Sequence, residues 1–241
     1  MAQKNEDDLA KLLEVLSHDI RNPLSIVLGQ LEVQADSFKE KGENLPKWLE
    51  KTSRAAAHME SILNLVRDIR ALDTGKIQLD LVPIKLKDVF HEVKFLFEDK
   101  LNAKKQTLEF ENKDKDDNLA VLAEKTSLCH QVMNNIVSNA IKFSPLNTKI
   151  KIDYMSEGDL VRLEIIDSGM GMPKEYVENI FRSDTKTSRK GTQWETGTGF
   201  GMPLAKRYME AFGGTIKVES KDVKEFPTDA GTKFILHLKK A

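Results

Sequence analysis

The chain has 241 residues, of which 40% are hydrophobic and 31% are charged, which is typical of a globular protein with one large domain or two ordinary ones. Its formal net charge of −1 leaves no excess of Lys and Arg to neutralise phosphates, so the composition argues against a nucleic-acid partner. A single cysteine, Cys129, excludes an internal disulfide framework and a cysteine-based zinc site. No apolar run approaches the roughly 20 residues of a membrane-spanning helix, and the polar start is unlike a signal peptide. We therefore expect a cytoplasmic chain without a membrane span.

The first predicted helix covers residues 6–38, where apolar residues recur at steps of three and four. It carries the octapeptide SHDIRNPL at residues 17–24. Helical spacing places His18, its neighbour Asp19 and, one turn further, Asn22 on one patch. In such a set the carboxylate can hold one imidazole N–H and leave the other nitrogen as a nucleophile, while the amide can orient a water molecule. The alternative is that His18 is an ordinary surface residue of an amphipathic helix.

A second helix is predicted over residues 48–72, after a glycine and a proline in residues 39–46 break the helical pattern. Two long helices with a short connection form an antiparallel hairpin. A lone hairpin buries only one side of each apolar stripe, so we expect a second copy to complete a four-helix bundle. The sequence thus predicts a homodimer through residues 6–72. The alternative is that the stripe packs against the rest of its own chain.

Beyond residues 73–75 the helical period stops and shorter elements follow. Strands are predicted over residues 77–81, 107–111, 119–123, 149–155, 160–166, 215–220 and 232–238. Helices are predicted over residues 86–103, 125–143 and 202–212. This mixed order predicts an α+β two-layer sandwich with helices on one face of a sheet.

The predicted helix over residues 125–143 carries two asparagines, Asn135 and Asn139, four residues apart on one face, with Lys142 three residues later. Neutral amide oxygens suit Mg²⁺, which takes few protein ligands and keeps water and substrate phosphates. The alternative is that these are solvated helix residues.

Two glycine-containing turns carry further signals. Asp167 directly follows an apolar strand and is followed by Gly169 and Gly171. A carboxylate at this place can accept a hydrogen bond from an exocyclic amine, and the glycines let a planar base approach the backbone; the alternative is an ordinary turn. The loop GTGFG at residues 197–201 opens a helix, whose free N–H groups and dipole favour phosphate. It lacks the lysine of a P-loop and the preceding strand of a dinucleotide-binding fold, and by itself it is a weak signal.

In this order, the histidine octapeptide, the asparagine helix, the aspartate-glycine turn and the glycine-rich helix start resemble the H, N, G1 and G2 boxes of bacterial two-component sensor histidine kinases. The resemblance covers residues 9–239. It implies a dimerisation and histidine-phosphotransfer hairpin over residues 1–72, a hinge at residues 73–76 and a catalytic domain over residues 77–241. The catalytic domain is expected to have the ATP-binding fold shared with Hsp90, gyrase and MutL.

The resemblance implies a function for the hairpin. His18 would be the phosphoacceptor in ATP-dependent autophosphorylation, with Asp19 as its general base. The phosphoryl group would then pass to an aspartate in the receiver domain of a response regulator. Asn22 would support phosphatase activity toward that partner. The alternatives are an ATP-binding dimeric pseudokinase or scaffold, and an ATPase or serine kinase on the same nucleotide-binding fold.

The resemblance also implies the nucleotide contacts, with ATP and Mg²⁺ as the expected ligands. Asn139 would ligate Mg²⁺ with help from Asn135, and Lys142 would reach the phosphates. Asp167 would accept from the adenine amino group, which favours ATP because guanine offers a carbonyl at that place. The other expected contacts are Gly169 and Gly171 in the base pocket, Gly197, Thr198, Gly199, Phe200 and Gly201 beside the phosphates, Phe143, and Arg182 near the γ-phosphate.

Three departures from the family pattern bear on these contacts. Phe143 stands where tyrosine is frequent, so one hydroxyl contact is missing. The phenylalanine-rich box is reduced at residues 177–181, which weakens the match of Arg182. Residues 183–196 carry three basic side chains among small polar ones, and we expect a mobile lid over ATP; the alternative is a loop without a role.

Overall fold

The computed structural model describes residues 2–73, 79–116, 118–182, 185, 189, 191–193, 195 and 199–241, with side chains from residue 19 onwards except those of residues 61, 65, 69 and 73. The chain divides into two compact units, Met1–Ile77 and Gln78–Ala241. Residues 74–76 of the expected hinge lie outside the described residues, so the hinge stays a prediction.

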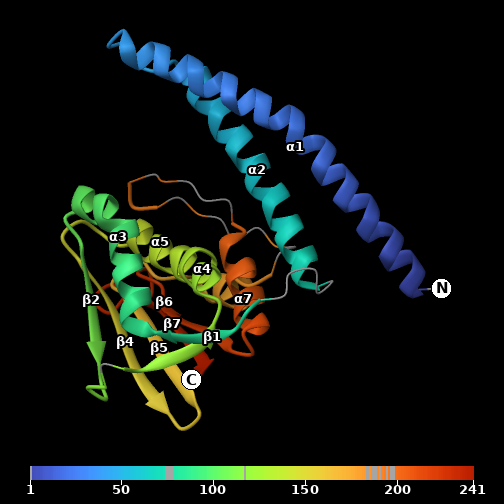
Figure 1. Cartoon of the computed structure of the whole chain (residues 1–241). Coiled ribbons are helices and arrows are strands. Elements are labelled where there is room, and N and C mark those ends of the chain that lie inside the picture. The colour runs from blue at the N-terminus through green and yellow to red at the C-terminus, as the bar shows by residue number, and fades with distance from the viewer. Residues whose placement is uncertain are drawn as a thin grey trace. The chain divides into compact units, whose positions relative to one another are not determined.

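The first unit is a hairpin of two long helices, α1 (Ala2–Glu40) and α2 (Lys47–Asp73) (Figure 1). Its core consists of small and large apolar side chains from both helices, namely Leu24, Leu31, Leu49, Ala56 and Leu63. The turn after α1 places Gly42 at φ +67° and lets the Glu43 amide donate to the Phe38 carbonyl at 2.9 Å. This is the usual glycine-dependent end of a helix. The predicted helical hairpin is therefore confirmed. None of the described helices is both long enough and apolar enough to cross a membrane.

The second unit is built on a mixed five-stranded sheet with the strand order β2-β4-β5-β7-β6. Its strands are β2 (Thr107–Asn112), β4 (Lys149–Glu157), β5 (Leu160–Asp167), β6 (Thr215–Lys221) and β7 (Gly231–Lys239). β2 and β4 are parallel, whereas the other neighbours are antiparallel. A separate antiparallel pair joins β1 (Val82–Lys85) to β3 (Ala120–Ala123).

Helices cover one face of this sheet (Figure 1). They are α3 (Leu86–Lys104), a continuous run of α4 (Lys125–Ser127), the π-helical turn η1 (Leu128–Met133) and α5 (Asn134–Phe143), and α7 (Gly201–Ala211). Alternate residues of the central strand β5, Val161, Leu163 and Ile165, are almost fully buried. A half-buried strand covered by helices on one side has this period of two. The predicted α+β two-layer sandwich is confirmed.

Three segments of the second unit differ from the sequence predictions. The strand expected over residues 77–81 is wrong, because residues 79–81 form no strand and β1 begins at Val82, where pairing with β3 begins opposite Ala123. The short helix α6 (Lys174–Asn179) was not predicted, since six residues are too few to display a helical period. The helix expected over residues 125–143 contains the π-helical turn η1. The other predicted elements of this unit agree with the structure to within two residues, whereas α1 of the first unit begins four residues before its predicted start.

Candidate functional site

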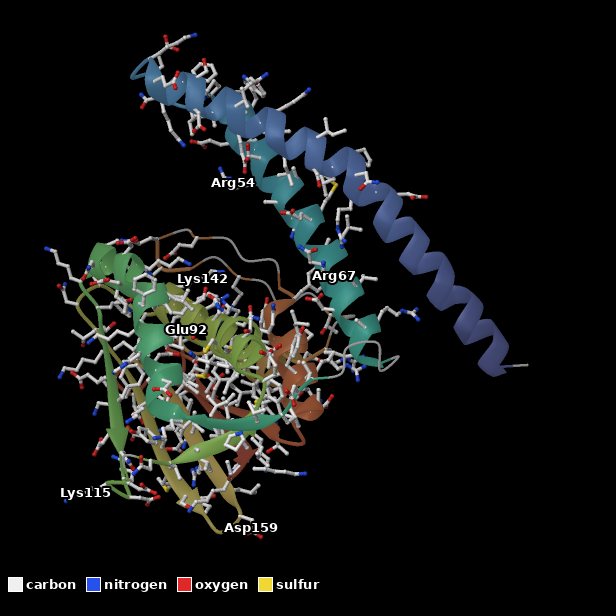
Figure 2. The ribbon with its side chains drawn as sticks, in the orientation of Figure 1. Arg54, Arg67, Glu92, Lys115, Lys142 and Asp159 are labelled. Atoms are coloured by element: carbon white, nitrogen blue, oxygen red, sulfur yellow. The ribbon has the colours of Figure 1, made fainter. Side chains whose placement is uncertain are left out.

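The helical run that carries the asparagines is fixed at its start by two glutamates. The Glu124 carboxylate accepts hydrogen bonds from the amides of Thr126 at 2.8 Å and Ser127 at 2.7 Å. These amides have no helical partner of their own, so the carboxylate acts as a cap. Figure 2 labels Glu92 on α3. Its carboxylate accepts from Lys125 Nζ at 3.0 Å, and this pairing holds the pKa of Glu92 below its ordinary value. The start of the run is thereby tied to α3.

α5 separates an apolar face from a polar one. Its buried residues are Ile136, Val137, Ala140 and Ile141. The polar face carries Asn135, Asn139 and Lys142, all half-buried. Burial lowers the pKa of Lys142, although the nearby Glu195 carboxylate favours the charged form. α5 thus presents two amides and one ammonium group, the types of group that the sequence predicted for Mg²⁺ and phosphate.

Gly201, the last residue of the glycine-rich sequence, lies against this polar face. A Cβ atom at position 201 would lie 2.3 Å from Asn135 Oδ1, so a side chain there would displace the amide. The Asn135 Nδ2 group donates to the Gln131 carbonyl at 2.6 Å, which fixes the orientation of the amide. Gly199 has φ +84°, a conformation that side-chain-bearing residues rarely adopt. The start of α7 and the start of α5 therefore form one junction.

Asp167 is a nearly buried carboxyl group, 7% exposed, at the end of β5. Burial raises its pKa to about 7, although backbone amides of Gly169 and Thr232 oppose the shift. The Gly169 amide donates to Asp167 Oδ1 at 2.9 Å. A Cβ atom on Gly169 would lie 2.7 Å from both that oxygen and the Phe143 carbonyl, so the turn packs directly on the end of α5. The Met170 amide also donates to the Phe143 carbonyl, at 3.1 Å.

Gly171 continues this turn at φ +62°, and a Cβ atom there would overlap the Lys221 carbonyl at the end of β6. Its own carbonyl accepts from Arg189 Nη2 at 2.6 Å. The Arg189 guanidinium lies 5.6 Å from the Phe143 ring centroid and 5.1 Å from that of Tyr176. Burial lowers the pKa of Arg189, while Asp222 and Tyr176 favour its charge.

Phe143 carries a second cation, because Lys142 Nζ lies 4.6 Å from its ring centroid. Such contacts stabilise a half-buried cation by about 1 kcal/mol. Two cations, Lys142 and Arg189, therefore share one ring next to the aspartate-glycine turn. Arg189 is one of the three basic residues in the expected lid over residues 183–196, and nothing in its local sequence indicates that it reaches Gly171.

Direct contacts join the predicted nucleotide residues in two groups. Gly201 meets Asn135, whereas Lys142, Phe143, Gly169 and Asp167 form a chain of contacts that Arg189 extends to Gly171. Asn139 shares the polar face of α5 with Asn135. Phe200 directly precedes α7 and is half-buried. Arg182 follows α6 with an exposed side chain. Gly197 and Thr198 lie outside the described residues.

The predicted phosphoacceptor residues belong to the first unit. His18 lies in α1, but its side chain lies outside the described part of the chain. Asp19 and Asn22 are exposed on the same helix. Exposure of this patch is compatible with access by a nucleotide or another protein.

Two family models match the chain. Residues 8–75 match the His Kinase A (phospho-acceptor) domain, and residues 124–241 match the histidine kinase-, DNA gyrase B- and HSP90-like ATPase. The sensor histidine kinase WalK of Bacillus subtilis is 28% identical over 220 residues, which cover 90% of this chain and 35% of WalK. The aerobic respiration control sensor protein ArcB of Escherichia coli is 29% identical over 228 residues, covering 90% of this chain and 28% of ArcB. The chain thus spans about a third of the length of these relatives.

Solved structures agree with the fold. The histidine kinase ThkA in complex with the response regulator protein TrrA is 27% identical, with a TM-score of 0.60, over 99% of this chain and 64% of that one. Full-length ShkA in complex with AMPPNP has a TM-score of 0.71 over 96% of this chain and 46% of that one; its 22% identity supports the fold alone. With the two matching domains in the predicted order, this chain belongs to the two-component sensor histidine kinases, with a phosphoacceptor domain followed by an ATP-binding domain.

Proposed function

We propose that this chain uses ATP to phosphorylate His18 and that the phosphoryl group then passes to an aspartate of a response regulator. The observation that carries the proposal is the contact of Gly201 with Asn135, which shares the polar face of α5 with Lys142 in a domain of the matching ATPase family. It brings neutral oxygens, a cation and the start of a helix together, and these groups favour a polyphosphate with a divalent cation. Phosphoryl transfer is catalysed mainly by such positioning and charge neutralisation.

Asp167 is proposed to select adenine. Its carboxylate is the buried acceptor of the turn, and a planar base can approach because Gly169 and Gly171 have no side chains. An exocyclic amine donates to such an acceptor, whereas the guanine carbonyl would leave two acceptors face to face. Gly171 and Gly169 also pack on the ends of β6 and α5, so the turn is held in place before a base arrives.

The donor set fits Mg²⁺. Asn139 would hold the cation and Asn135 would help to place it, because amide oxygens are hard, neutral ligands. Bound Mg²⁺ would neutralise charge on the phosphates. Lys142 would bind the phosphates directly. Arg189 stands next to Lys142 on the Phe143 ring and is a better candidate for a second phosphate-binding cation than the exposed Arg182.

The hairpin is proposed to supply the acceptor and the partner surface. Asp19 would accept an imidazole N–H of His18 and leave the other nitrogen free to attack the γ-phosphorus. A response regulator as partner is supported by the complex of ThkA with TrrA, which covers nearly the whole of this chain. Asn22 is proposed to orient a water molecule for dephosphorylation of that partner, and the relative LuxQ carries the name sensor kinase/phosphatase.

The hairpin is further proposed to form a homodimer. Several large apolar side chains stay more than 40% exposed on it: Ile20, Ile26, Val27, Val33, Trp48 and Met59. A second hairpin packed against part of this surface would complete a four-helix bundle.

The test is incubation of the wild type and His18→Gln with γ-labelled ATP and Mg²⁺, followed by acid and alkali treatment of the label. We expect an acid-labile, alkali-stable label that is absent from the variant. Asn22→Ala should label normally but slow the loss of label from a phosphorylated receiver domain. Acid-stable label in the variant would instead favour a serine kinase, and nucleotide binding without label would favour a scaffold.

A further inference from the structure

Lys104 is a buried lysine, 4% exposed, at the C-terminal end of α3. A lysine is almost never buried to this extent unless its ammonium group is paired. Its Nζ contacts acceptors on two different segments: the carbonyls of Ile141 at 2.9 Å, Lys142 at 3.1 Å and Ser144 at 3.4 Å, the Thr192 hydroxyl at 2.8 Å and the Glu195 carboxylate at 2.7 Å.

The first segment is the end of α5. The last carbonyls of a helix have no partner within it, and the helix dipole makes that end negative. Lys104 places a positive charge with several donors at this point. Gln106 adds a neutral donor, since its Nε2 reaches the Pro145 carbonyl at 2.9 Å. The backbone of Lys142, which lies on the polar face of α5, is therefore hydrogen-bonded to a side chain of α3.

The second segment is the anchored loop, defined as residues 191–193 and 195. The Thr192 amide donates to the Lys142 carbonyl at 3.0 Å, and the Gly191 amide donates to the Glu195 carbonyl at 2.9 Å. A Cβ atom on Gly191 would lie 2.5 Å from Lys142 Cγ, so the loop rests on the Lys142 side chain itself. Lys104 is thus bonded to both partners of a contact between the loop and Lys142.

The charges of these groups explain why the pairing matters. Partial burial raises the pKa of Glu195, but hydrogen bonds from Lys104 and from backbone amides outweigh it and leave the pKa below its ordinary value. Glu195 is therefore anionic and lies close enough to favour the charged form of Lys142. If Lys104 were removed, the Glu195 carboxylate would lose its partner and could pair with the Lys142 ammonium group instead. A carboxylate paired with Lys142 would compete with phosphate for the same ammonium group.

We propose that Lys104 is a positioning residue of the nucleotide site, which anchors the loop on the end of α5 and keeps the Glu195 carboxylate from occupying Lys142. This inference rests on the proposed function, in which Lys142 binds phosphate. Lys104 itself is not proposed to contact phosphate. It acts through Thr192 and Glu195.

The first test is amide hydrogen exchange of the full chain without nucleotide, comparing the wild type with Lys104→Met. We expect the Gly191 and Thr192 amides to exchange at least tenfold faster in the variant, while the amides of β5 and β7 keep their protection and so report an intact sheet. Lys100→Met is the matched control, because Lys100 lies one helical turn earlier on α3 and is exposed. Unchanged protection of Gly191 and Thr192 in Lys104→Met would refute the proposal that Lys104 anchors the loop on α5. This result does not depend on ATP binding.

The second test is ATP affinity measured by equilibrium titration. We expect Lys104→Met to raise the Kd at least fivefold and Glu195→Gln in the same chain to restore most of the affinity. If Lys104 served only the stability of the domain, the amides of β5 and β7 would lose protection in Lys104→Met. Equal losses of ATP affinity in the single and double variants would refute the competition between Glu195 and phosphate for Lys142. Absence of ATP binding in the wild type would instead refute the proposed function, and the exchange experiment would still decide whether Lys104 anchors the loop.

Discussion

Asp167 is a carboxyl group that the fold keeps almost out of water. Its folded-state pKa of about 7 lies above its ordinary value of 3.8, so the folded protein holds the proton more tightly than the unfolded chain. Asp167 therefore lowers the free energy of unfolding progressively as the pH rises from about 4 to about 7, and by a constant amount above that. The proposed adenine acceptor thus lowers the stability of the domain at neutral pH.

For Asp167→Asn we expect the free energy of unfolding of the catalytic domain at pH 8 to rise by about 1–3 kcal/mol, because an amide needs no ionisation to remain buried. The gain should shrink as the pH falls toward 4. ATP affinity should fall at least tenfold. Hydrogen exchange of β5 and β7 measures the first effect and nucleotide titration the second. Asp159→Asn, in the exposed turn after β4, is the control. Unchanged stability of Asp167→Asn at pH 8 would contradict the proposal that burial of the Asp167 carboxylate destabilises the domain.

The residues whose grouping can be predicted from sequence are those whose relation is local. Asn135 and Asn139 are one helical turn apart, and Asp167 ends an apolar strand, so periodicity places them. Lys104 and Arg189 were not predictable as parts of the site. Lys104 reaches Thr192 across 88 positions of sequence, and Arg189 reaches Gly171 across 18. Only the folded chain brings such pairs together.

Among the elements, α5 and α7 meet at the Asn135–Gly201 contact, where the backbone of one helix start touches the side chain of the other. Gly201→Ala adds a Cβ atom 2.3 Å from Asn135 Oδ1 and must displace one of the two. We expect the Kd for ATP with Mg²⁺ to rise at least tenfold, measured by titration. Gly29→Ala is the matched control, since a Cβ there meets no atom within 4 Å, and it should leave the Kd unchanged. Equal affinity of Gly201→Ala and the wild type would refute the importance of this junction.

Elements with a long, regular period were predictable, and elements fixed by their partners were not. α3 and β5 show their periods in sequence and agree with prediction. β1 begins at Val82 because β3 lies opposite residues 82–85, which no local pattern in residues 77–81 reveals. α6 is too short to display a period. The π-helical turn η1 leaves the apolar spacing of its run almost unchanged and so escapes detection.

At the scale of the whole molecule, the hairpin carries more apolar surface than one chain covers. On α1, Ile20 is 46% and Val27 43% exposed, although both lie on the stripe that continues through the buried Leu24 and Leu31. Helical spacing of four, three and four residues makes these four side chains neighbours. The stripe is thus buried on one flank by α2 and open on the other, as expected of one half of a four-helix bundle.

Val27→Lys tests whether that open flank is the dimer interface. A lysine there would bring two like charges into an apolar seam, so we expect the wild type to sediment with twice the mass of its 27.3 kDa chain and the variant to shift toward the monomer, with at least a tenfold larger dimer dissociation constant. Val33→Lys is the control, because Val33 is 71% exposed and its helical position is opposite to Leu24. If only Val33→Lys dissociated the dimer, the interface would have to lie on the opposite face of α1. A wild type that is monomeric at all concentrations would refute the dimer.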